Sequence, residues 1–574
     1  GDVVPADGRL VSSATLEVQE AALTGESAPV SKDPAPIGDP ETALGDRVNM
    51  VFQNTSVTRG TASFVVTATG SATEMGKIAG LLKSVKRSDS PLQRELSGLT
   101  KWLGVVAWAA VALIFVIGLF RGLPIEDLVL LAITTAISAI PTGLPTFVQV
   151  MLSNGSQRLA QAKAVVKNLN DVETLGATSA INSDKTGTLT LNQMTATKLY
   201  GGGMWLVIEG SGYEKQGAIL RDAGHDVPDL TPLAYGLALC SDATVSDTGE
   251  VVGDPTEAAL VVLAAKIGVD AETSRRELPR LAEVPFDSAY KFMATFHEDP
   301  REPGTIIELV KGAPDVVIDR CATAVWDGEE VPIDEVRARI VAANSELGAG
   351  GLRVLSFAYR RLPGSEMDAL GDDPMARVAD LVFVALVGII DPLRPSAKDA
   401  VATALGAGID VRMITGDHAV TAKAIADDLG LGPGVITGPE FERLDDADLH
   451  ERLPELHVFG RVAPQDKLRL VANMQDDGLV VAMTGDAVND AAALKKADIG
   501  VAMGSGSEVS KQAAKMVLTD DNFSTLVHAV ELGRDIYGKI TAYIRYQLTG
   551  LFGLLSLMLL ATLFDVNSGI ALTP

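Results

Sequence analysis

The chain has 574 residues, and its 74 acidic and 48 basic side chains give a formal net charge of −26 at pH 7. So acidic a chain lacks the basic footprint of a nucleic-acid-binding protein, and we expect no nucleic-acid partner. Its two cysteines, Cys240 and Cys321, form no Cys-x-x-Cys pair, which argues against a disulfide framework and a structural zinc site. The 47% hydrophobic content favours membrane spans joined to acidic soluble domains. The chain begins at Gly1 without a signal peptide and stops ten residues after an apolar run, so we expect truncation at both ends.

Residues 1–100 contain short β-rich runs between Gly, Pro and Asp turns, a pattern typical of a small β domain. Within them lies Thr24-Gly25-Glu26-Ser27. Gly25 allows a tight turn that would expose the Glu26 carboxylate. Taken alone, these four residues are equally compatible with an ordinary solvent loop.

Two uncharged apolar runs, 103–120 and 128–152, reach the length of a membrane helix. A third run covers 541–564 and has Arg545 near its start. Lysines and arginines precede the first run and follow the second, and the positive-inside rule places both of these flanks in the cytoplasm. The alternative is that these runs are buried core helices of a soluble protein.

The second run is interrupted by Pro141-Thr142-Gly143-Leu144-Pro145. Two prolines and a glycine free backbone carbonyls in mid-membrane, where they are tolerated only if protein or a water-filled site satisfies them. This predicts either an ion site or a simple proline kink.

The residues Asp184-Lys185-Thr186-Gly187-Thr188-Leu189-Thr190 follow a short apolar run, 177–181, that reads as a buried strand. An Asp at the end of such a strand lies at the carboxyl edge of a sheet, where open α/β sheets bind ligands. Gly187 and the small hydroxyl residues allow a sharp turn with N–H groups that face an anion. The group suits a carboxylate that attacks a phosphoryl group, although a capped strand-to-helix turn is the plainer alternative.

Further along the chain, strands and helices alternate, which predicts a doubly wound parallel sheet. We expect this sheet to resume at Leu381 after an insertion, and to include strands that end in Thr415-Gly416-Asp417 and Thr484-Gly485-Asp486. Asp184, Asp417 and Asp486 would then gather at one edge, where a cation such as Mg²⁺ would relieve their repulsion. Lys467 would neutralise phosphoryl charge, or would simply lie on a solvated helix face.

The insertion, residues 198–385, carries the side chains that an adenine and its phosphates require. These are an aromatic residue, a lysine beside a glycine and an arginine: Phe286, Lys311 and Arg353. Glu257 and Lys291 lie in the same insertion. Each taken singly is more often a surface or core residue. No Gly-x-x-x-x-Gly-Lys-Ser/Thr sequence is present, so a P-loop is not supported.

The run from Asp184 to Thr190 resembles the phosphorylation motif of P-type ATPases, ion pumps of the haloacid-dehalogenase superfamily. Thr24 to Ser27 resembles their actuator loop, and Gly485-Asp486-Ala487-Val488-Asn489-Asp490 resembles their hinge motif, in which Ala487 replaces the usual Gly. Pro141 to Pro145 resembles the ion-binding motif of pumps for calcium and related cations.

The resemblance implies a multidomain integral membrane protein, which we expect in the plasma membrane with its large domains in the cytoplasm. Its parts would be an α/β haloacid-dehalogenase-like phosphorylation domain, an inserted α+β nucleotide-binding domain, a β-rich actuator domain and transmembrane helices. The expected boundaries are 1–100 for the actuator and linker, 101–152 for two membrane helices, 153–197 and 386–535 for the two parts of the phosphorylation domain, 198–385 for the nucleotide domain, and 536–574 for a stalk, a third span and an outer loop.

By the same resemblance, ATP would phosphorylate one aspartate in an ATPase reaction coupled to cation translocation across the bilayer. Catalytic roles fall to Asp184, Lys467, Glu26, Thr415 and Asp417. Contacts to ATP fall to Glu257, Phe286, Lys291, Lys311, Arg353, Thr415, Gly416, Asp417 and Asn489. Mg²⁺ would be held by Asp184, Asp486 and the Thr186 carbonyl, and the transported ion by Ile140 and Thr142.

The chain departs from the calcium pumps at the ion site. Those pumps usually have carboxylate or amide side chains at the positions of Thr142, Leu551 and Leu554. A neutral hydroxyl binds a divalent ion more weakly than a carboxylate does, so calcium and a monovalent cation both remain open. Two other functions are also considered: a membrane-anchored phosphatase of the same superfamily, and an inactive pump relative.

Overall fold

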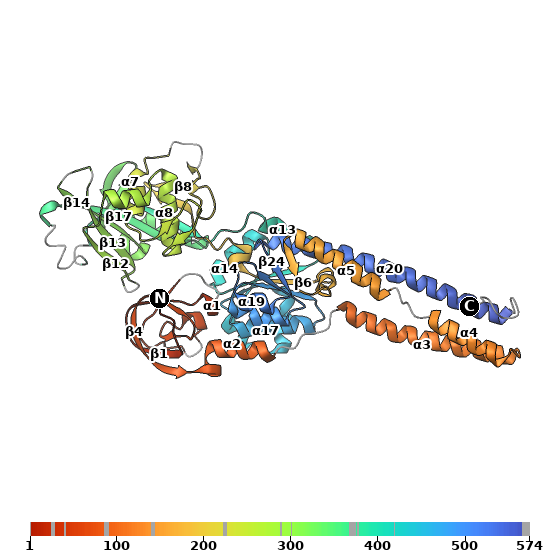
Figure 1. The fold of residues 1–574 in the computed structure, drawn as a ribbon. Coiled ribbons are helices and arrows are strands. Elements are labelled where there is room, and N and C mark those ends of the chain that lie inside the picture. Colours follow the sequence, from red (N-terminus) through yellow and green to blue (C-terminus); the bar gives the residue numbers. More distant parts are fainter. Residues whose placement is uncertain are drawn as a thin grey trace.

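The computed structural model describes residues 2–24, 29–39, 42–84, 91–138, 144–221, 227–287, 290–299, 301–302, 304–366, 375, 378–417 and 419–564. In these residues the chain forms three folded bodies and a set of long helices that extend away from the middle body (Figure 1).

The middle body contains a sheet whose strand order, in the described residues, is β20-β21-β19-β6-β22-β23-β24-β5. All neighbours run parallel except β24 and β5. Its apolar strands are buried on both faces, as parallel strands covered by helices require. The strands are β5 (Ala164–Val166), β6 (Ala180–Asp184), β19 (Asp410–Thr415), β20 (Gly434–Thr437), β21 (Leu456–Gly460), β22 (Val481–Gly485), β23 (Ile499–Met503) and β24 (Met516–Leu518).

Helices connect the strands and cover the sheet. The helices of this body are α6 (Asp171–Gly176), α13 (Ala397–Gly406), α14 (Ala419–Leu429), α15 (Gly438–Arg443), α16 (Asp446–Arg452), α17 (Pro464–Asp476), α18 (Ala491–Lys496) and α19 (Glu508–Ala513). The alternation of strands and helices agrees with the doubly wound sheet that the sequence predicts.

The expectation that the parallel sheet resumes at Leu381 is wrong. The strand β18 (Leu381–Ile390) instead pairs antiparallel with β17 (Arg353–Pro363) and β7 (Thr195–Gly201) in the sheet of the inserted body. An apolar run without alternation fits a buried strand in either sheet, so the sequence alone did not assign it. The middle sheet resumes with β19.

The inserted body is a mixed but mainly antiparallel sheet with helices on both faces, green in Figure 1. One face packs on α7 (Thr231–Leu239) and α8 (Pro255–Ile267), and the other on α11 (Ile333–Ala349). The remaining elements are β8 (Met204–Ile208), β9 (Ile219–Arg221), β10 (Thr244–Val245), β11 (Val251–Val252), α9 (Ala271–Glu277), β12 (Ala282–Asp287), β13 (Phe292–Glu298), β14 (Thr305–Gly312), α10 (Pro314–Ile318), β15 (Cys321–Trp326) and β16 (Glu329–Pro332).

The N-terminal body is built on two long antiparallel strands, β1 (Asp7–Gln19) and β4 (Ser56–Ala68). Their register is broken by bulges, which bend the pair and close a small apolar core. Shorter elements complete this body: α1 (Ala21–Thr24), β2 (Val30–Ser31), β3 (Met50–Val51) and α2 (Glu74–Ser84).

Four helices form the part of the chain beyond the middle body: α3 (Pro91–Phe120), α4 (Ile125–Ser138), α5 (Leu144–Gln161) and α20 (Phe523–Phe564). Of these, α4 lies at the far end, beside α3 (Figure 1). Among the described residues, two of them, Lys101–Phe120 within α3 and all of α20, contain apolar stretches long enough to cross a membrane. The second expected run is divided between α4 and α5, so the structure does not confirm three spans. Residues 139–143, which include Ile140 and Thr142, lie outside the described residues.

The helix α20 is continuous from the parallel sheet to the far end of the apolar bundle (Figure 1). Its first turns are buried in the core of the sheet, and Gly533 packs against Gly176 of α6 so closely that a Cβ on either residue would overlap the other's backbone. At the other end, Arg121 donates a hydrogen bond to the Thr562 carbonyl at 2.6 Å.

Candidate active site

Asp184 is the last residue of β6, which lies between β19 and β22 in the parallel sheet. Its backbone N–H donates to Thr484 Oγ1 on the neighbouring strand at 3.0 Å. Asp184 is 5% exposed, so its carboxylate opens on the carboxyl edge of the sheet with little access to water. This is the edge at which open α/β sheets bind ligands.

The turn Lys185–Leu189 carries the chain away from this edge. Gly187 has φ of +71°, a conformation that L side chains rarely adopt, and Arg394 donates to its carbonyl at 3.0 Å. Lys185 Nζ lies 2.6 Å from Asp417 Oδ2, which follows β19. The motif is therefore tied to the next strand by an ion pair, and Thr186 within it is 6% exposed.

Lys467, near the start of α17, points at Asp184. Its Nζ lies 3.1 Å from Asp184 Oδ1 and 2.6 Å from Asp490 Oδ1. Burial alone would lower the pKa of this ammonium, but the carboxylates of Asp490 and Asp184 raise it above its usual range. Lys467 therefore stays charged and is held between two acids.

A third carboxylate, Asp486, follows β22. Its Oδ2 lies 3.1 Å from the position that a Cβ on residue 187 would occupy, which places it against the Asp184 turn. Burial and then repulsion from Asp184 and Asp490 raise the pKa of Asp486. Burial likewise raises the pKa of Asp184 to about 6, because the nearby charge of Lys467 only partly opposes this effect. The positive charge of Lys467 does not balance the clustered carboxylates, and a bound cation would reduce their repulsion.

The donor chemistry of this edge fits Mg²⁺, which takes one or two carboxylates together with phosphate and water oxygens. Asp184, Asp486 and the Thr186 carbonyl would supply the protein oxygens. No cluster of three or more His, Cys, Asp or Glu within the described residues is arranged to enclose a metal by itself. Asn489 Oδ1 is a further buried oxygen at this edge without a hydrogen-bond partner in the described part of the chain.

Thr415 ends β19 and is 1% exposed, and its Oγ1 accepts the backbone N–H of Asp417 at 3.0 Å. Gly416, between them, lines a cavity described below. The structure thus brings Asp184, Lys467, Asp417 and Asp486 together with Thr415.

Two chain segments cross where the middle body meets the inserted body. Asp391 Oδ2 accepts from Thr190 Oγ1 at 2.5 Å, and Asp391 Oδ1 accepts from the Gln193 N–H at 3.0 Å. These bonds join the segment that leads into the inserted body to the segment that leads out of it, close to the turn after Asp184. Two short chain segments, held together by these hydrogen bonds, therefore connect the inserted body to the middle body.

In the inserted body, Lys311 on β14 and Glu257 on α8 form a buried ion pair with a separation of 2.6 Å. Burial would raise the pKa of Glu257, but Lys311 and the N–H groups of Asp242 and Ala243 hold it below its usual value. Arg353 donates to Thr256 Oγ1 at 3.0 Å beside this pair.

The other two residues of the inserted body that were expected at the nucleotide lie on β12 and just before β13. Phe286, on β12, is half-buried, and Lys291 is an exposed residue with a positive φ of +56°. Lys291 is 3.9 Å from Asp315, a weak surface pair, so it is free to turn toward an anion.

The N-terminal body approaches the site through α1. Glu26 lies outside the described residues, but the carbonyl of Glu20 accepts from Leu23 and Thr24 just before it. The Glu20 side chain forms a fully buried ion pair with Lys32 at 2.6 Å. This pair joins the chain before Glu26 to the chain after it.

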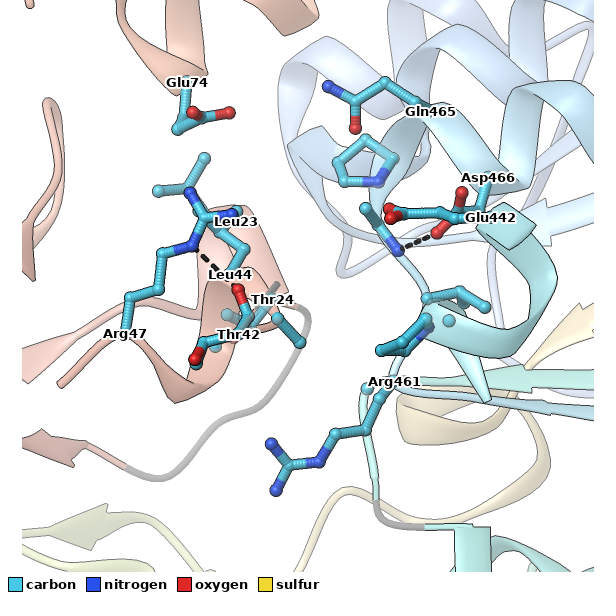
Figure 2. A pocket seen from close by; sticks show the side chains of 18 of the residues that line it. Leu23, Thr24, Thr42, Leu44, Arg47, Glu74, Glu442, Arg461, Gln465 and Asp466 are labelled. Atoms are coloured by element: carbon cyan, nitrogen blue, oxygen red, sulfur yellow. Dashed lines mark hydrogen bonds between the residues drawn. The ribbon is translucent and has the colours of Figure 1, made fainter. Parts of the chain in front are cut away.

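A cavity of about 560 Å³ separates the N-terminal body from the middle body. Figure 2 shows Thr42 and Arg47 on one wall and Gln465 and Asp466 on the other. Asp466 accepts from the Ala463 N–H at 2.7 Å and so caps α17, the helix that carries Lys467.

Sequence reasoning did not assign two of the residues that position Asp184. Thr484, which receives its N–H, was read only as part of a motif. Asp490 was likewise read as part of the motif that resembles the hinge, and it is the closer partner of Lys467. The signal for Asp490 was its spacing of four residues from Asp486, which places both on one short turn.

The site and the fold define a class of protein: an α/β domain of the haloacid-dehalogenase type with a buried Asp at the end of a central strand, a large insertion and a separate β-rich domain. Residues 1–83 match the family model for the P-type ATPase actuator domain, residues 229–396 that for P-type ATPase cytoplasmic domain N, and residues 469–530 that for haloacid dehalogenase-like hydrolases.

The chain is 41% identical over 567 residues to "Calcium-transporting ATPase 1" of Lactococcus lactis subsp. lactis, covering 96% of the chain and 62% of that protein. It is 42% identical over 575 residues to "Calcium-transporting ATPase" of Bacillus subtilis, covering 98% and 64%. It is 40% identical over 565 residues to "Probable cation-transporting ATPase F" of Mycobacterium tuberculosis, covering 96% and 61%.

The chain belongs to the P-type ATPase family, and the proteins it resembles are cation-transporting members. It spans slightly less than two thirds of the length of these relatives.

Proposed function

We propose that the chain is the catalytic part of an ATP-driven cation transporter in which Asp184 is phosphorylated and the resulting aspartyl phosphate is then hydrolysed. The observation that carries this proposal is the placement of the Asp184 carboxylate at the end of β6, with Lys467 Nζ at 3.1 Å. A buried nucleophilic carboxylate beside a fixed positive charge suits attack on a phosphoryl group.

In the proposed reaction, an Asp184 oxygen attacks the terminal phosphorus of ATP, and the bond from that phosphorus to the ADP oxygen breaks. Lys467 offsets the negative charge on the transferred group, and Asp417 and Thr415 help to position it. Asp184, Asp486 and the Thr186 carbonyl would hold Mg²⁺, which when bound would stabilise the negative charge of the phosphoryl group as a Lewis acid. Water then attacks the phosphorus, which releases phosphate and restores Asp184.

ATP would bind to the inserted body, with its adenine on Phe286 and its charged parts near Lys291, Lys311 and Arg353. The paired Glu257 and Lys311 would form the floor of this pocket. The short connection at Asp391 would let the inserted body bring the terminal phosphate to Asp184. Glu26 would direct the hydrolytic water in the second half of the cycle.

The translocated species would be a cation, and the protein would lie in a membrane, for which we propose the cell membrane. The names of the relatives make calcium the first candidate. Against it stands the absence of carboxylates at Thr142, Leu551 and Leu554. Leu551 is buried against Leu103 and Leu555, which supports an apolar packing role for that position.

The direct test is acid-quenched labelling of the full-length protein with γ-labelled ATP and Mg²⁺. We expect an acid-stable, hydroxylamine-labile label that disappears in Asp184→Ala and Asp184→Asn, because an amide is a poor nucleophile. An Asp399→Asn variant, on the exposed face of α13, serves as the matched control. A label that resists hydroxylamine, or that persists in Asp184→Ala, would refute the proposal.

The same label tests the role of Glu26. We expect Glu26→Gln to become phosphorylated and then to retain the label longer, because only the hydrolytic step loses its helper. A Glu26→Gln variant that takes up no label would contradict this assignment.

A further inference from the structure

The N-terminal body touches the inserted body at the residue expected to hold adenine. Nη1 of Arg59, on β4, donates to the carbonyl oxygen of Phe286 on β12 at 2.6 Å. The two bodies lie side by side at this point in Figure 1, where the edge of the red body meets the lower end of the green one. The contact joins residues 227 positions apart in the chain.

The backbone around Arg59 directs its side chain outward. Arg59 pairs with Glu17 of β1, and the register shifts on both sides of Glu17. Gly60 has φ of +77°, and a Cβ there would lie 2.3 Å from the Thr15 carbonyl oxygen. Such bulges increase the twist of a strand pair and redirect a side chain, which here faces the neighbouring body.

The surface that Arg59 meets is acidic. Burial raises the pKa of Glu17, and after the opposing effect of Arg59 the charges of Asp254, Asp287 and Glu257 raise it further. These three acids belong to the inserted body, so the Glu17–Arg59 pair lies at the rim of the candidate nucleotide pocket. Arg59 is the positive group that complements this rim.

We propose that Arg59 is an autoinhibitory latch, which holds the N-terminal body on Phe286 and so obstructs the entry of a nucleoside triphosphate into the pocket. This inference rests on the proposed nucleotide function of the inserted body. The adenine stack and the latch use the same residue, one through its ring and the other through its carbonyl. Docking of the N-terminal body and nucleotide binding therefore compete.

Competition has a measurable consequence. When only the undocked fraction can bind, the apparent dissociation constant is the intrinsic one divided by that fraction. Removal of the latch raises the undocked fraction and tightens binding. A bound nucleotide, in turn, keeps the two bodies apart.

The first test measures equilibrium binding of a non-hydrolysable ATP analogue to the full-length protein and its variants. Because a charged hydrogen bond is lost, we expect Arg59→Ala to bind about 3- to 10-fold more tightly than wild type. Thr58→Ala is the matched control, since that exposed neighbour donates only to Glu17 within its own body. Equal affinity in Arg59→Ala would overturn the latch, as would weaker binding, which would make Arg59 a nucleotide contact.

The second test measures the distance between the two bodies directly. The chain has two cysteines, and both are buried, so introduced cysteines at Glu17 and Asp287 can be cross-linked selectively. We expect efficient cross-linking that the analogue slows severalfold and that each single-cysteine variant lacks. Cross-linking at a rate that the analogue leaves unchanged would overturn the latch. If no variant binds the analogue, both the latch and the proposed nucleotide function fail, whereas equal binding by all variants refutes the latch alone.

Discussion

The ammonium nitrogen of Lys467 lies 3.1 Å from Asp184 Oδ1, and the two side chains are 2% and 7% exposed. Asp490 takes a second, shorter contact to the same nitrogen at 2.6 Å. One cation therefore serves two buried acids, and its removal would leave both without a partner. Loss of one member of a buried ion pair typically costs about 3–5 kcal/mol of stability.

From this geometry we expect Lys467→Met to lose phosphoenzyme formation by at least about 100-fold, because the transferred phosphoryl charge would meet two unpaired carboxylates. The measurement is acid-quenched labelling with γ-labelled ATP. Lys398→Met, which removes an exposed lysine paired with Asp428, should label normally. Normal labelling of Lys467→Met would remove this residue from the catalytic group.

Gly187→Ala tests the turn that follows Asp184. Alanine would have to adopt the left-handed conformation that Gly187 already has, and its methyl group would lie 3.1 Å from Asp486 Oδ2. The backbone cost is about 1 kcal/mol, but displacement of Asp486 should weaken the apparent Mg²⁺ affinity of the labelling reaction more strongly. Gly268→Ala is the control, since Gly268 also has positive φ and no neighbour within 4 Å. A similar Mg²⁺ dependence in both variants would contradict the placement of Asp486.

Glu308 predicts a pH dependence in the inserted body. Burial raises its pKa to about 7, despite Arg360 Nε at 3.0 Å, and its Oε1 has no hydrogen-bond partner among the described residues. In the folded state Glu308 therefore keeps a proton that it releases in the unfolded chain above a pH of about 4.5. The stabilising contribution of this group is fully present below that pH and is lost as pH rises through 7, at about 1.4 kcal/mol per unit of pKa difference.

Denaturant unfolding of the full-length protein, followed by the fluorescence of Trp205 and Trp326 in the inserted body, measures this effect. Between pH 5 and pH 8 the free energy of unfolding should fall less in Glu308→Gln than in wild type. Glu335→Gln, at an exposed position of α11, should behave as wild type does. Parallel curves for wild type and Glu308→Gln would show that the carboxyl group is not protonated in the folded state.

The ion site predicts opposite effects of two changes at Thr142. With a carboxylate in place, Thr142→Glu should raise the apparent affinity for Ca²⁺, because a charged oxygen binds a divalent ion more strongly. Thr142→Val should weaken stimulation by the natural ion. Cation-stimulated ATPase of the full-length protein measures both, and unchanged ion dependence in both variants would place the site elsewhere.

Much of the parallel sheet was predictable, because strands that end in Thr-Gly-Asp have a recognisable local pattern. Their shared edge follows from parallel topology. The position of β18 was not predictable, since its apolar residues fit a buried strand in either sheet. The contact from Arg59 to Phe286 was also beyond the sequence, because a single arginine in a strand carries no sign of which body it will meet. In the described residues the second apolar run is covered by α4 and α5, and the sequence did not fix where each helix ends.

The unbroken course of α20 has a mechanical consequence. With 42 residues it is about 63 Å long, so a tilt of about 10° at its base would carry its far end about 11 Å sideways. The close packing of Gly533 on Gly176 clamps that base to the parallel sheet, which leaves no loose joint to absorb the motion. The helix is therefore a lever arm, and small rotations of the domain that holds Asp184 would become large displacements among the apolar helices.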